Sequence, residues 1–190
     1  MRPALMILAD DPVHGIAGLT DEQATVEALL VRALDQARQV PGVGRLLLFH
    51  PDEAESRLAP RALGFRMWPQ DGGSLGERYR NAFRQAIELG YEGGIVVELT
   101  VPTFPVERVC EAAALLDEHH GVIAGDGNGG IALLALQEPQ PTLFSGPARP
   151  TYDEFCTRAA QQRVQLVKLP EHPAITAEEL SEFLSSGARQ

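Results

Sequence analysis

Residues 93–105 read GGIVVELTVPTFP, and this stretch decides the fold class. Two glycines precede a short apolar run, Ile95–Val97, and two prolines, Pro102 and Pro105, follow it closely. An apolar run of this length with such neighbours is typical of a strand that is buried on both faces of a parallel sheet. In α/β enzymes, polar chemistry lies just beyond the carboxyl end of such a strand. Here that place holds Glu98, followed by Leu, Thr and Val.

Similar apolar runs alternate with helical patterns along the rest of the chain. Strands are expected at Ala4–Ala9, Leu46–Phe49, Phe65–Trp68, Ile95–Val97, Gly121–Ala124, Ile131–Leu136 and Val164–Leu169. Capping boxes predict helices that begin at Thr20, Ser74, Thr151 and Thr176, and a fifth helix is expected from Pro105 to about His119. Strands that alternate with helices indicate an α/β fold, a three-layer α/β/α sandwich around a mainly parallel mixed sheet.

The composition limits the number of domains and the kinds of partner. With 190 residues, of which 44% are apolar, we expect one domain at residues 1–184 and a frayed tail at 185–190. No run approaches the roughly 20 apolar residues of a membrane span, and the N-terminus lacks the pattern of a signal peptide, so we expect a cytoplasmic protein without a membrane partner. The net charge of −10, without a basic stripe, argues against nucleic acid.

Several lone residues have an ordinary structural interpretation beside a functional one. Cys110 and Cys156 belong to no CxxC motif and are expected to be buried free thiols. His119 and His120 close a helix, where cationic side chains suit the dipole, so a metal role is the less favoured interpretation. His14 is the only titratable residue in its loop and could contact a ligand. Asp126 suits either a glycine-rich turn, which we favour, or a replacement carboxylate.

Three segments together carry a family resemblance: residues 70–78 (QDGGSLGER), 128–136 (NGGIALLAL) and 143–146 (LFSG). On these motifs the chain resembles the bacterial glycosyltransferase-like proteins of the nucleotide-diphospho-sugar transferase (glycosyltransferase A) fold. It is more distantly similar to phospholactate guanylyltransferase. The similarity extends from about residue 4 to residue 184. Each motif is short, but all occur in the family's order and at compatible spacing.

The resemblance also indicates that the active-site motifs have degenerated. Where the family carries Ser-Asp-Cys-Pro-x-Leu-Pro, this chain has Thr100 at the Asp position. The family's Asp-Gly-Gly-Tyr begins here with Asn128, and its late Asp-Val-Asp-Thr reads Pro-Ala-Ile-Thr at residues 173–176. Its basic first loop is neutral after residues 12–15. Mg²⁺ and Mn²⁺ need carboxylates, and phosphates need cations, so we expect no metal cofactor or only a weakly held Mg²⁺ or Mn²⁺.

The same resemblance places a ligand site at the carboxyl edge of the sheet. Glycines allow close backbone approach, and a capped helix start exposes amides that suit a phosphate or hydroxyl group. The expected ligand-binding residues are Asp10, Gln70, Gly72, Gly73, Ser74, Arg78, Thr100 and Asn128. Ordinary alternatives remain open: Asp10 and Asp11 also suit a solvated turn, and Glu98 suits an ion pair better than a replacement carboxylate.

The resulting hypothesis is a diverged glycosyltransferase-like protein. If active, it transfers a sugar from a nucleotide-sugar donor to a small acceptor; otherwise it is a pseudoenzyme. The alternative is a non-catalytic ligand-binding or assembly protein that keeps the pocket for another small polar ligand. A weaker alternative is a nucleotidyltransferase, which the missing basic loop disfavours. The sequence leaves open whether the chain forms a homodimer, and it assigns no catalytic residue.

Overall fold

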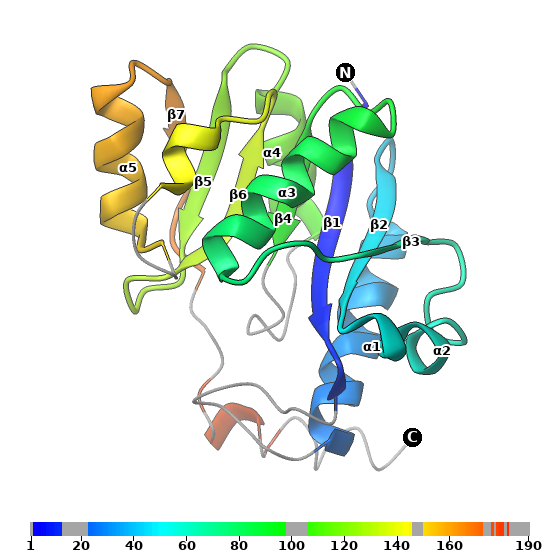
Figure 1. Ribbon diagram of the computed structural model, residues 1–190. Coiled ribbons are helices and arrows are strands. Elements are labelled where there is room, and N and C mark those ends of the chain that lie inside the picture. The colour runs from blue at the N-terminus through cyan, green and yellow to red at the C-terminus, as the bar shows by residue number, and fades with distance from the viewer. Residues whose placement is uncertain are drawn as a thin grey trace.

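The computed structural model describes residues 2–12, 23–97, 106–145, 150–172, 176, 178–180 and 182. Within them, seven strands form one sheet in the order β3-β2-β1-β4-β6-β5-β7 (Figure 1). The strands are β1 (Ala4–Asp10), β2 (Gly44–His50), β3 (Arg66–Pro69), β4 (Gly94–Val97), β5 (Gly121–Gly125), β6 (Ile131–Leu136) and β7 (Leu166–Lys168). The α-helices are α1 (Gln23–Gln39), α2 (Glu55–Leu58), α3 (Leu75–Glu88), α4 (Val106–Leu115) and α5 (Tyr152–Gln161). Two short 3₁₀ helices are η2 (Asp52–Ala54) and η3 (Pro141–Phe144).

The sheet is mixed but mainly parallel, as the sequence predicts. Strands β1 to β4 run parallel to one another, and β7 is parallel to β5. Only β6 is antiparallel to its neighbours β4 and β5 among the strands described. A tight turn joins β5 to β6, and a hairpin requires antiparallel strands. The hairpin places β6 between β4 and β5, so β5 again runs in the direction of β4.

Strand β4 lies in the interior of the sheet, between β1 and β6, which confirms the prediction for Ile95–Val97. All four of its residues are buried. Gly94 is required here because a Cβ atom at this position would lie 2.5 Å from Cε of Met6 and 2.8 Å from Cδ1 of Phe83. Residues 98–105, which include Glu98 and Thr100, are outside the described part of the chain.

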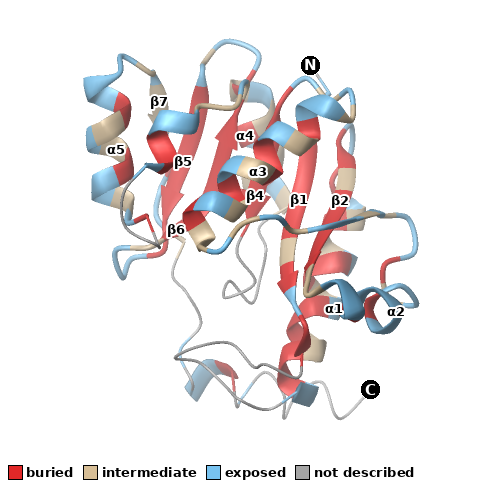
Figure 2. Cartoon of the chain, viewed as in Figure 1, coloured by how far each residue is buried: buried red, intermediate tan, exposed pale blue. Residues whose placement is uncertain are grey.

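Helices cover both faces of the sheet (Figures 1 and 2). Side chains alternate along a strand, so β1 sends Leu5 and Ile7 into one core and Met6 into the other. The first core includes α1, α2 and α4, and the second includes α3, α5 and η3. In the second core, the ring centroids of Phe144 and Phe83 lie 5.9 Å apart. These two cores confirm the predicted three-layer sandwich.

The predicted helix starts are found wherever the chain is described. Ser74 and Thr151 each form a complete capping box, and Thr176 exchanges hydrogen bonds with Glu179. Thr20 is outside the described residues. Helix α4 ends at Leu115 and not near His119, because the amides of Asp117 and Glu118 bond carbonyls three residues back and tighten the chain into turns before β5. No described helix has the length and apolar character needed to cross a membrane.

Candidate functional site

The carboxyl ends of β1, β2 and β3 meet at one edge of the sheet, and Gln70 joins them. Its backbone amide donates to the Phe49 carbonyl at 2.7 Å. Its side-chain Nε2 donates to the carbonyls of Leu48 at 2.8 Å and Ala9 at 3.1 Å. Both N–H groups of the side-chain amide are therefore used to hold the three strand ends together. Gln70 positions the loop that follows it, and its Oε1 atom carries no hydrogen bond among the described residues.

The loop from β3 to α3 is closely packed on the first turn of the helix. Gly72 has φ of +128°, and a Cβ atom there would lie 2.8 Å from Cβ of Glu77 and 2.9 Å from the amide nitrogen of Arg78. Only glycine fits this conformation without strain. Ser74 then caps α3 by accepting a hydrogen bond from the Glu77 amide at 3.3 Å. The turn itself therefore requires the first glycine of the motif, Gly72.

The amides at this helix start already have an anionic partner. The carboxylate of Glu77 accepts hydrogen bonds from the amide of Gly73 at 2.9 Å and from that of Ser74 at 3.1 Å. The sequence predicts that Gly73 and Ser74 bind a ligand. In the structure, the amides of these two residues bind the Glu77 carboxylate. The N-terminus of a helix attracts negative charge. A phosphate at this point would have to displace Glu77, whose side chain is exposed and free to move away.

Arg78 links the helix to the end of β1. Its Nη1 atom lies 2.7 Å from Oδ1 of Asp10, and its Nε donates to the Gly72 carbonyl at 3.4 Å. The Arg78 side chain is only 18% exposed, whereas that of Asp10 is 53% exposed. The neighbouring Asp11 is buried and forms an ion pair with Arg57 at 2.6 Å, so it braces η2 and α2 against the edge. The structure thus brings together Asp10 and the residue 70–78 loop, which the sequence predicts to share a site.

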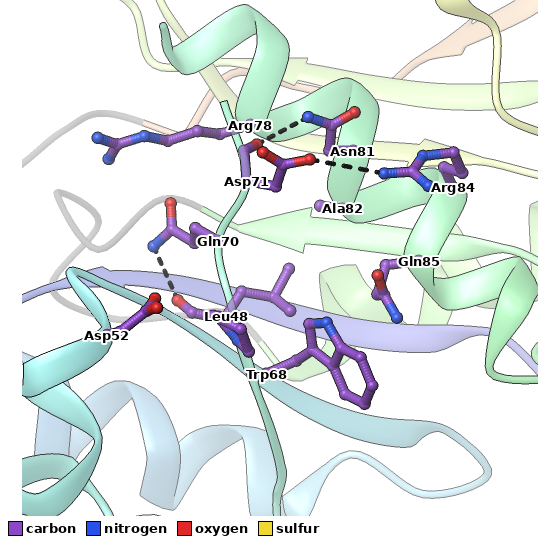
Figure 3. A pocket seen from close by; sticks show the side chains of 11 residues that line it. Leu48, Asp52, Trp68, Gln70, Asp71, Arg78, Asn81, Ala82, Arg84 and Gln85 are labelled. Atoms are coloured by element: carbon purple, nitrogen blue, oxygen red, sulfur yellow. Dashed lines mark hydrogen bonds and ion pairs between the residues drawn. The ribbon is translucent and has the colours of Figure 1, made fainter. Parts of the chain in front are cut away.

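A cavity of about 300 Å³ adjoins this loop between β3 and α3. Figure 3 shows Gln70, Asp71 and Arg78 at one end, and Trp68 facing Gln85 of α3 at the other. Asn81 donates to the Asp71 carbonyl at 2.8 Å, which fixes the loop to the helix. The sequence analysis did not single out Trp68 or Gln85. The cavity forms only when α3 lies across β3, and no local motif marks that packing.

Asn128 lies at the same edge of the sheet but away from Asp10. It belongs to the β5–β6 turn and is exposed. Three strand spacings separate β1 from β5, which is about 14 Å. Within the turn, Oδ1 of Asp126 accepts hydrogen bonds from the amides of Asn128 at 2.8 Å and Gly130 at 2.7 Å. This confirms the turn interpretation of Asp126, and a ligand that contacts both Asp10 and Asn128 must be elongated.

A second small cavity at this edge contains residues that the sequence analysis missed. Arg108 of α4 and His172 line it together with apolar residues of β4, β5 and β6. The amide of His172 donates to the carbonyl of Gly125 at 2.8 Å, which holds it beside the end of β5. His172 follows β7, and its place after a parallel strand is a signal that could have identified it. Among the described residues, no three His, Cys, Asp or Glu side chains gather as metal ligands would.

The cysteines and the His119-His120 pair show no sign of catalytic chemistry. Cys110 and Cys156 are free, as predicted, but half-buried and not fully buried, because each lies at the margin of a helix face. Burial raises the pKa of the Cys156 thiol, which disfavours the thiolate that a nucleophile needs. Nδ1 of His120 accepts a hydrogen bond from the Gln165 amide at 3.3 Å and so joins the turn before β5 to the residue before β7. His14 is outside the described residues, and so are residues 173–175 of the late family motif.

Comparison with known proteins agrees with this geometry at the level of fold. Residues 33–148 match the model of a family described as "Uncharacterized protein conserved in bacteria (DUF2064)". No curated protein matches the sequence. A provisionally assigned nucleotide-diphospho-sugar transferase from Desulfovibrio desulfuricans G20 superposes with a TM-score of 0.81 at 18% identity, covering 100% of this chain and 89% of the other.

Two further solved structures, a synthase and a synthetase, also share the fold. The 4-diphosphocytidyl-2C-methyl-D-erythritol synthase from Anaerococcus prevotii has a TM-score of 0.67 at 10% identity and covers 100% and 97% of the two chains. The CMP:2-keto-3-deoxy-manno-octonic acid synthetase, solved with CTP, has a TM-score of 0.63 at 12% identity and covers 100% and 99%. At these identities the matches establish a nucleotide-diphospho-sugar transferase fold, and the residues at the edge of the sheet must decide what it binds.

Proposed function

The chain belongs to the DUF2064 family of proteins conserved in bacteria, and we propose that it binds a nucleotide-sugar along the carboxyl edge of its sheet. The activity proposed for it is that of a diverged glycosyltransferase, which transfers the sugar to a small acceptor. The elongated arrangement of the edge supports this ligand class. A nucleoside diphosphate joined to a sugar is long enough to extend from the end of β1 toward the β5–β6 turn.

The observation that carries the proposal is the ion pair between Arg78 and Asp10. It holds a cation, mostly shielded from solvent, beside the glycine loop and the amides at the start of α3. A phosphate bound here would accept charge-assisted hydrogen bonds from Arg78 and from the Gly73 and Ser74 amides. It would replace two carboxylates, those of Asp10 and Glu77, as the partner of these groups. The net charge of −10 makes such a local cation essential.

The chemistry of transfer follows from the same groups. Sugar transfer breaks the bond between the sugar carbon and the diphosphate oxygen and forms a bond from that carbon to the acceptor hydroxyl oxygen, whose proton leaves to solvent; negative charge builds up on the departing diphosphate. Arg78 and the helix start would stabilise that charge. Asp10, released from Arg78, would be free to bind a sugar hydroxyl. The described residues that fall near the family's metal position, Asn128 and Asp126, fit a metal poorly, since one is an amide and the other is bonded to two backbone amides, so no step is derived through an ion.

A second candidate is a binding or assembly protein without catalysis. The specific observation in its favour is Glu77, whose carboxylate occupies the amides that a phosphate would use. A nucleotide site that has lapsed would tolerate such a carboxylate permanently. The neutral residues Thr100 and Asn128, at positions where the resembling family carries acids, favour the same alternative.

Thermal-shift measurements with UDP-, GDP- and dTDP-sugars, each with and without Mn²⁺, test the proposal. A nucleotide-sugar-binding protein should be stabilised by one donor, and an active transferase should then release the nucleoside diphosphate when acceptors are added. CTP and GTP serve as the nucleotidyltransferase arm. If no donor or triphosphate raises the melting temperature at millimolar concentration, the binding or assembly protein becomes the correct assignment.

A further inference from the structure

The cavity between β3 and α3 has features that the proposed nucleotide-sugar site does not use. It adjoins that site at Gln70, Asp71 and Arg78, but the rest of its wall comes from β2, η2, β3 and the later turns of α3. Seven of its eleven lining residues carry polar side chains. A volume of about 300 Å³ is at the lower end of the range for pockets that bind small ligands.

Trp68 supplies the largest apolar surface in this wall. It lies on the edge strand β3, and 38% of its surface is exposed although its ring is large and apolar. Figure 3 shows the indole ring projecting from β3 toward α3. An exposed aromatic face with polar residues around it is a common feature of binding sites. The exposed part of this side chain is largely apolar, so a ligand that covered it would remove apolar surface from water.

Gln85 faces Trp68 from α3, and its side-chain amide lacks a hydrogen-bond partner among the described residues. It is half-buried, and its amide offers two donors and one acceptor. Its neighbours differ in this respect. Asn81 donates to the Asp71 carbonyl, and Arg84 lies 3.0 Å from the Glu88 carboxylate. A half-buried amide gains stability from a ligand that both donates and accepts.

The charges of the residues that line the cavity balance, two negative from Asp52 and Asp71 and two positive from Arg78 and Arg84. Both guanidinium groups also have carboxylate partners beside the cavity, Asp10 for Arg78 and Glu88 for Arg84. A free phosphate would meet two carboxylates in this space, and a free cation would meet two guanidinium groups. Electrostatics therefore favour a ligand without net charge.

We propose that this cavity binds a neutral carbohydrate ring, with its C–H face on Trp68 and its hydroxyl groups bonded to Gln85 and the charged residues nearby. Hydroxyl groups both donate and accept, so they suit a wall on which carboxylates, guanidinium groups and amides alternate. A nucleobase has two apolar faces and polar groups only at its edges. It would meet one flat apolar wall at Trp68 and a polar amide opposite.

The proposal rests on the proposed function in one respect only. If the chain transfers sugar from a nucleotide donor, the carbohydrate in this cavity is the acceptor, and its hydroxyl must reach the donor near Arg78. Trp68, Gln70 and Arg78 line one cavity of about 300 Å³, which is compatible with an acceptor of one or two rings. Carbohydrate binding itself can be measured without any donor.

The chain offers a direct probe, because Trp68 is its only tryptophan. We would titrate the full chain with glucose, galactose, N-acetylglucosamine and maltose, and follow tryptophan emission. Uridine, cytidine and guanosine form the nucleobase arm. We expect a saturable change in tryptophan emission with at least one neutral sugar and no change in emission with the nucleosides. Saturation by a nucleoside alone would overturn the carbohydrate assignment, and a flat response throughout would overturn the site.

Two variants test the site itself by saturation-transfer NMR, which needs no tryptophan. Gln85→Ala should weaken sugar binding about fivefold, the value of one or two hydrogen bonds. Trp68→Leu should abolish it while the thermal melt stays cooperative. Arg80→Ala, five residues before Gln85 on α3 and outside the cavity lining, should bind like the unmodified chain. The proposal would be overturned if Gln85→Ala and Trp68→Leu both bound sugar as tightly as the unmodified chain does.

The outcomes also separate this proposal from the proposed function. Sugar binding without any thermal response to nucleotide-sugars keeps the carbohydrate site and rejects the transferase. A response to a nucleotide-sugar, with unchanged tryptophan emission in every neutral-sugar titration, keeps the proposed function and rejects the carbohydrate site.

Discussion

Nη1 of Arg78 lies 2.7 Å from Oδ1 of Asp10, so an arginine in the first turn of α3 is held over the end of β1. The two residues are 68 positions apart in sequence. Their contact joins the glycine-rich loop to the first strand of the sheet. Because Asp10 is half-exposed, the pair contributes little to stability, less than about 1 kcal/mol. Its more important effect is to keep a cation at the carboxyl edge until an anionic ligand replaces the aspartate.

Removing this cation should therefore affect binding more than folding. Arg78→Ala should weaken nucleotide-sugar binding tenfold or more, because charge-assisted hydrogen bonds contribute about 1.5–3 kcal/mol. Asp10→Asn should leave that affinity unchanged or raise it, since Arg78 then has no carboxylate to exchange for the phosphate and the asparagine oxygen can still accept a hydrogen bond from a sugar hydroxyl. Calorimetry on both variants makes the comparison. Equal losses in the two would contradict a phosphate-binding role for Arg78.

Arg45→Ala is the matched control at the opposite edge of the sheet. Arg45 donates to the carbonyls of Ala37, Arg38 and Val40 at the end of α1. Its loss leaves these carbonyls without their partner and should destabilise the fold by about 1–3 kcal/mol in urea denaturation. Ligand affinity should not change. A parallel loss of affinity in Arg45→Ala would mean that the assay reports folding and not the site.

Glu77→Ala should separate capping from ligand binding at the start of α3. Losing the reciprocal cap should cost about 1 kcal/mol of folding free energy. The same change frees the amides of Gly73 and Ser74, so affinity for a nucleoside diphosphate should rise. Glu154→Ala removes the equivalent half of the capping box of α5. Glu154→Ala should show the same loss of stability and no gain in affinity. If Glu77→Ala also fails to raise the affinity for a nucleoside diphosphate, Glu77 serves only as a helix cap.

Gly94→Ala tests why the strand at the centre of the fold begins with glycine. The added methyl group would lie within 2.8 Å of both Met6 and Phe83 in the second core, and overpacking of this kind costs about 1–3 kcal/mol. Gly73→Ala is the control, because its Cβ atom would meet nothing closer than 3.5 Å. Chemical denaturation of the two variants gives the difference. A Gly94→Ala protein as stable as the control would mean that this part of the core rearranges freely.

The sequence predicted the strands better than it predicted how they pair. All seven expected strands are present, because runs such as Leu46–Phe49 and Ile131–Leu136 are apolar throughout, as burial on both faces requires. The position of β6 between β4 and β5 was not predicted. Pairing between distant strands depends on the whole sheet and leaves no local signal. The helices η2, α2 and η3 were also missed, since each is too short to show a period.

The candidate site was predicted in part. The resemblance brought Asp10 and the residue 70–78 loop together, and the structure places them in contact. The capping box at Ser74 was predicted correctly, and in the structure its Glu77 side chain turns back onto the helix start and also occupies the amides that were expected to bind a ligand. Trp68 and Gln85 could not be found from sequence, because they meet only through the packing of α3 on β3.

The last prediction distinguishes a lapsed transferase from a protein rebuilt for another role. Thr100→Asp combined with Asn128→Asp restores two of the acids that the resembling family carries. The carboxylate at position 128 would be available to a metal, whereas that of Asp126 is bonded to two amides of its own turn. In a lapsed transferase, nucleotide-sugar affinity should rise modestly and become dependent on Mn²⁺. The gain stays modest because the basic first loop is still missing.

Calorimetry with one donor, with and without Mn²⁺, measures this effect in the double variant and in each single variant. The single variants should gain little, because one carboxylate holds a divalent ion weakly and two hold it better. Without metal the double variant should be slightly less stable, since the resemblance implies that both new carboxylates belong to one metal position, where they would repel. Asp126→Asn is the control, and it should lose turn stability without changing Mn²⁺ dependence. If the double variant binds no donor at millimolar concentration with or without Mn²⁺, the edge no longer serves a nucleotide, and the binding or assembly protein is the better assignment.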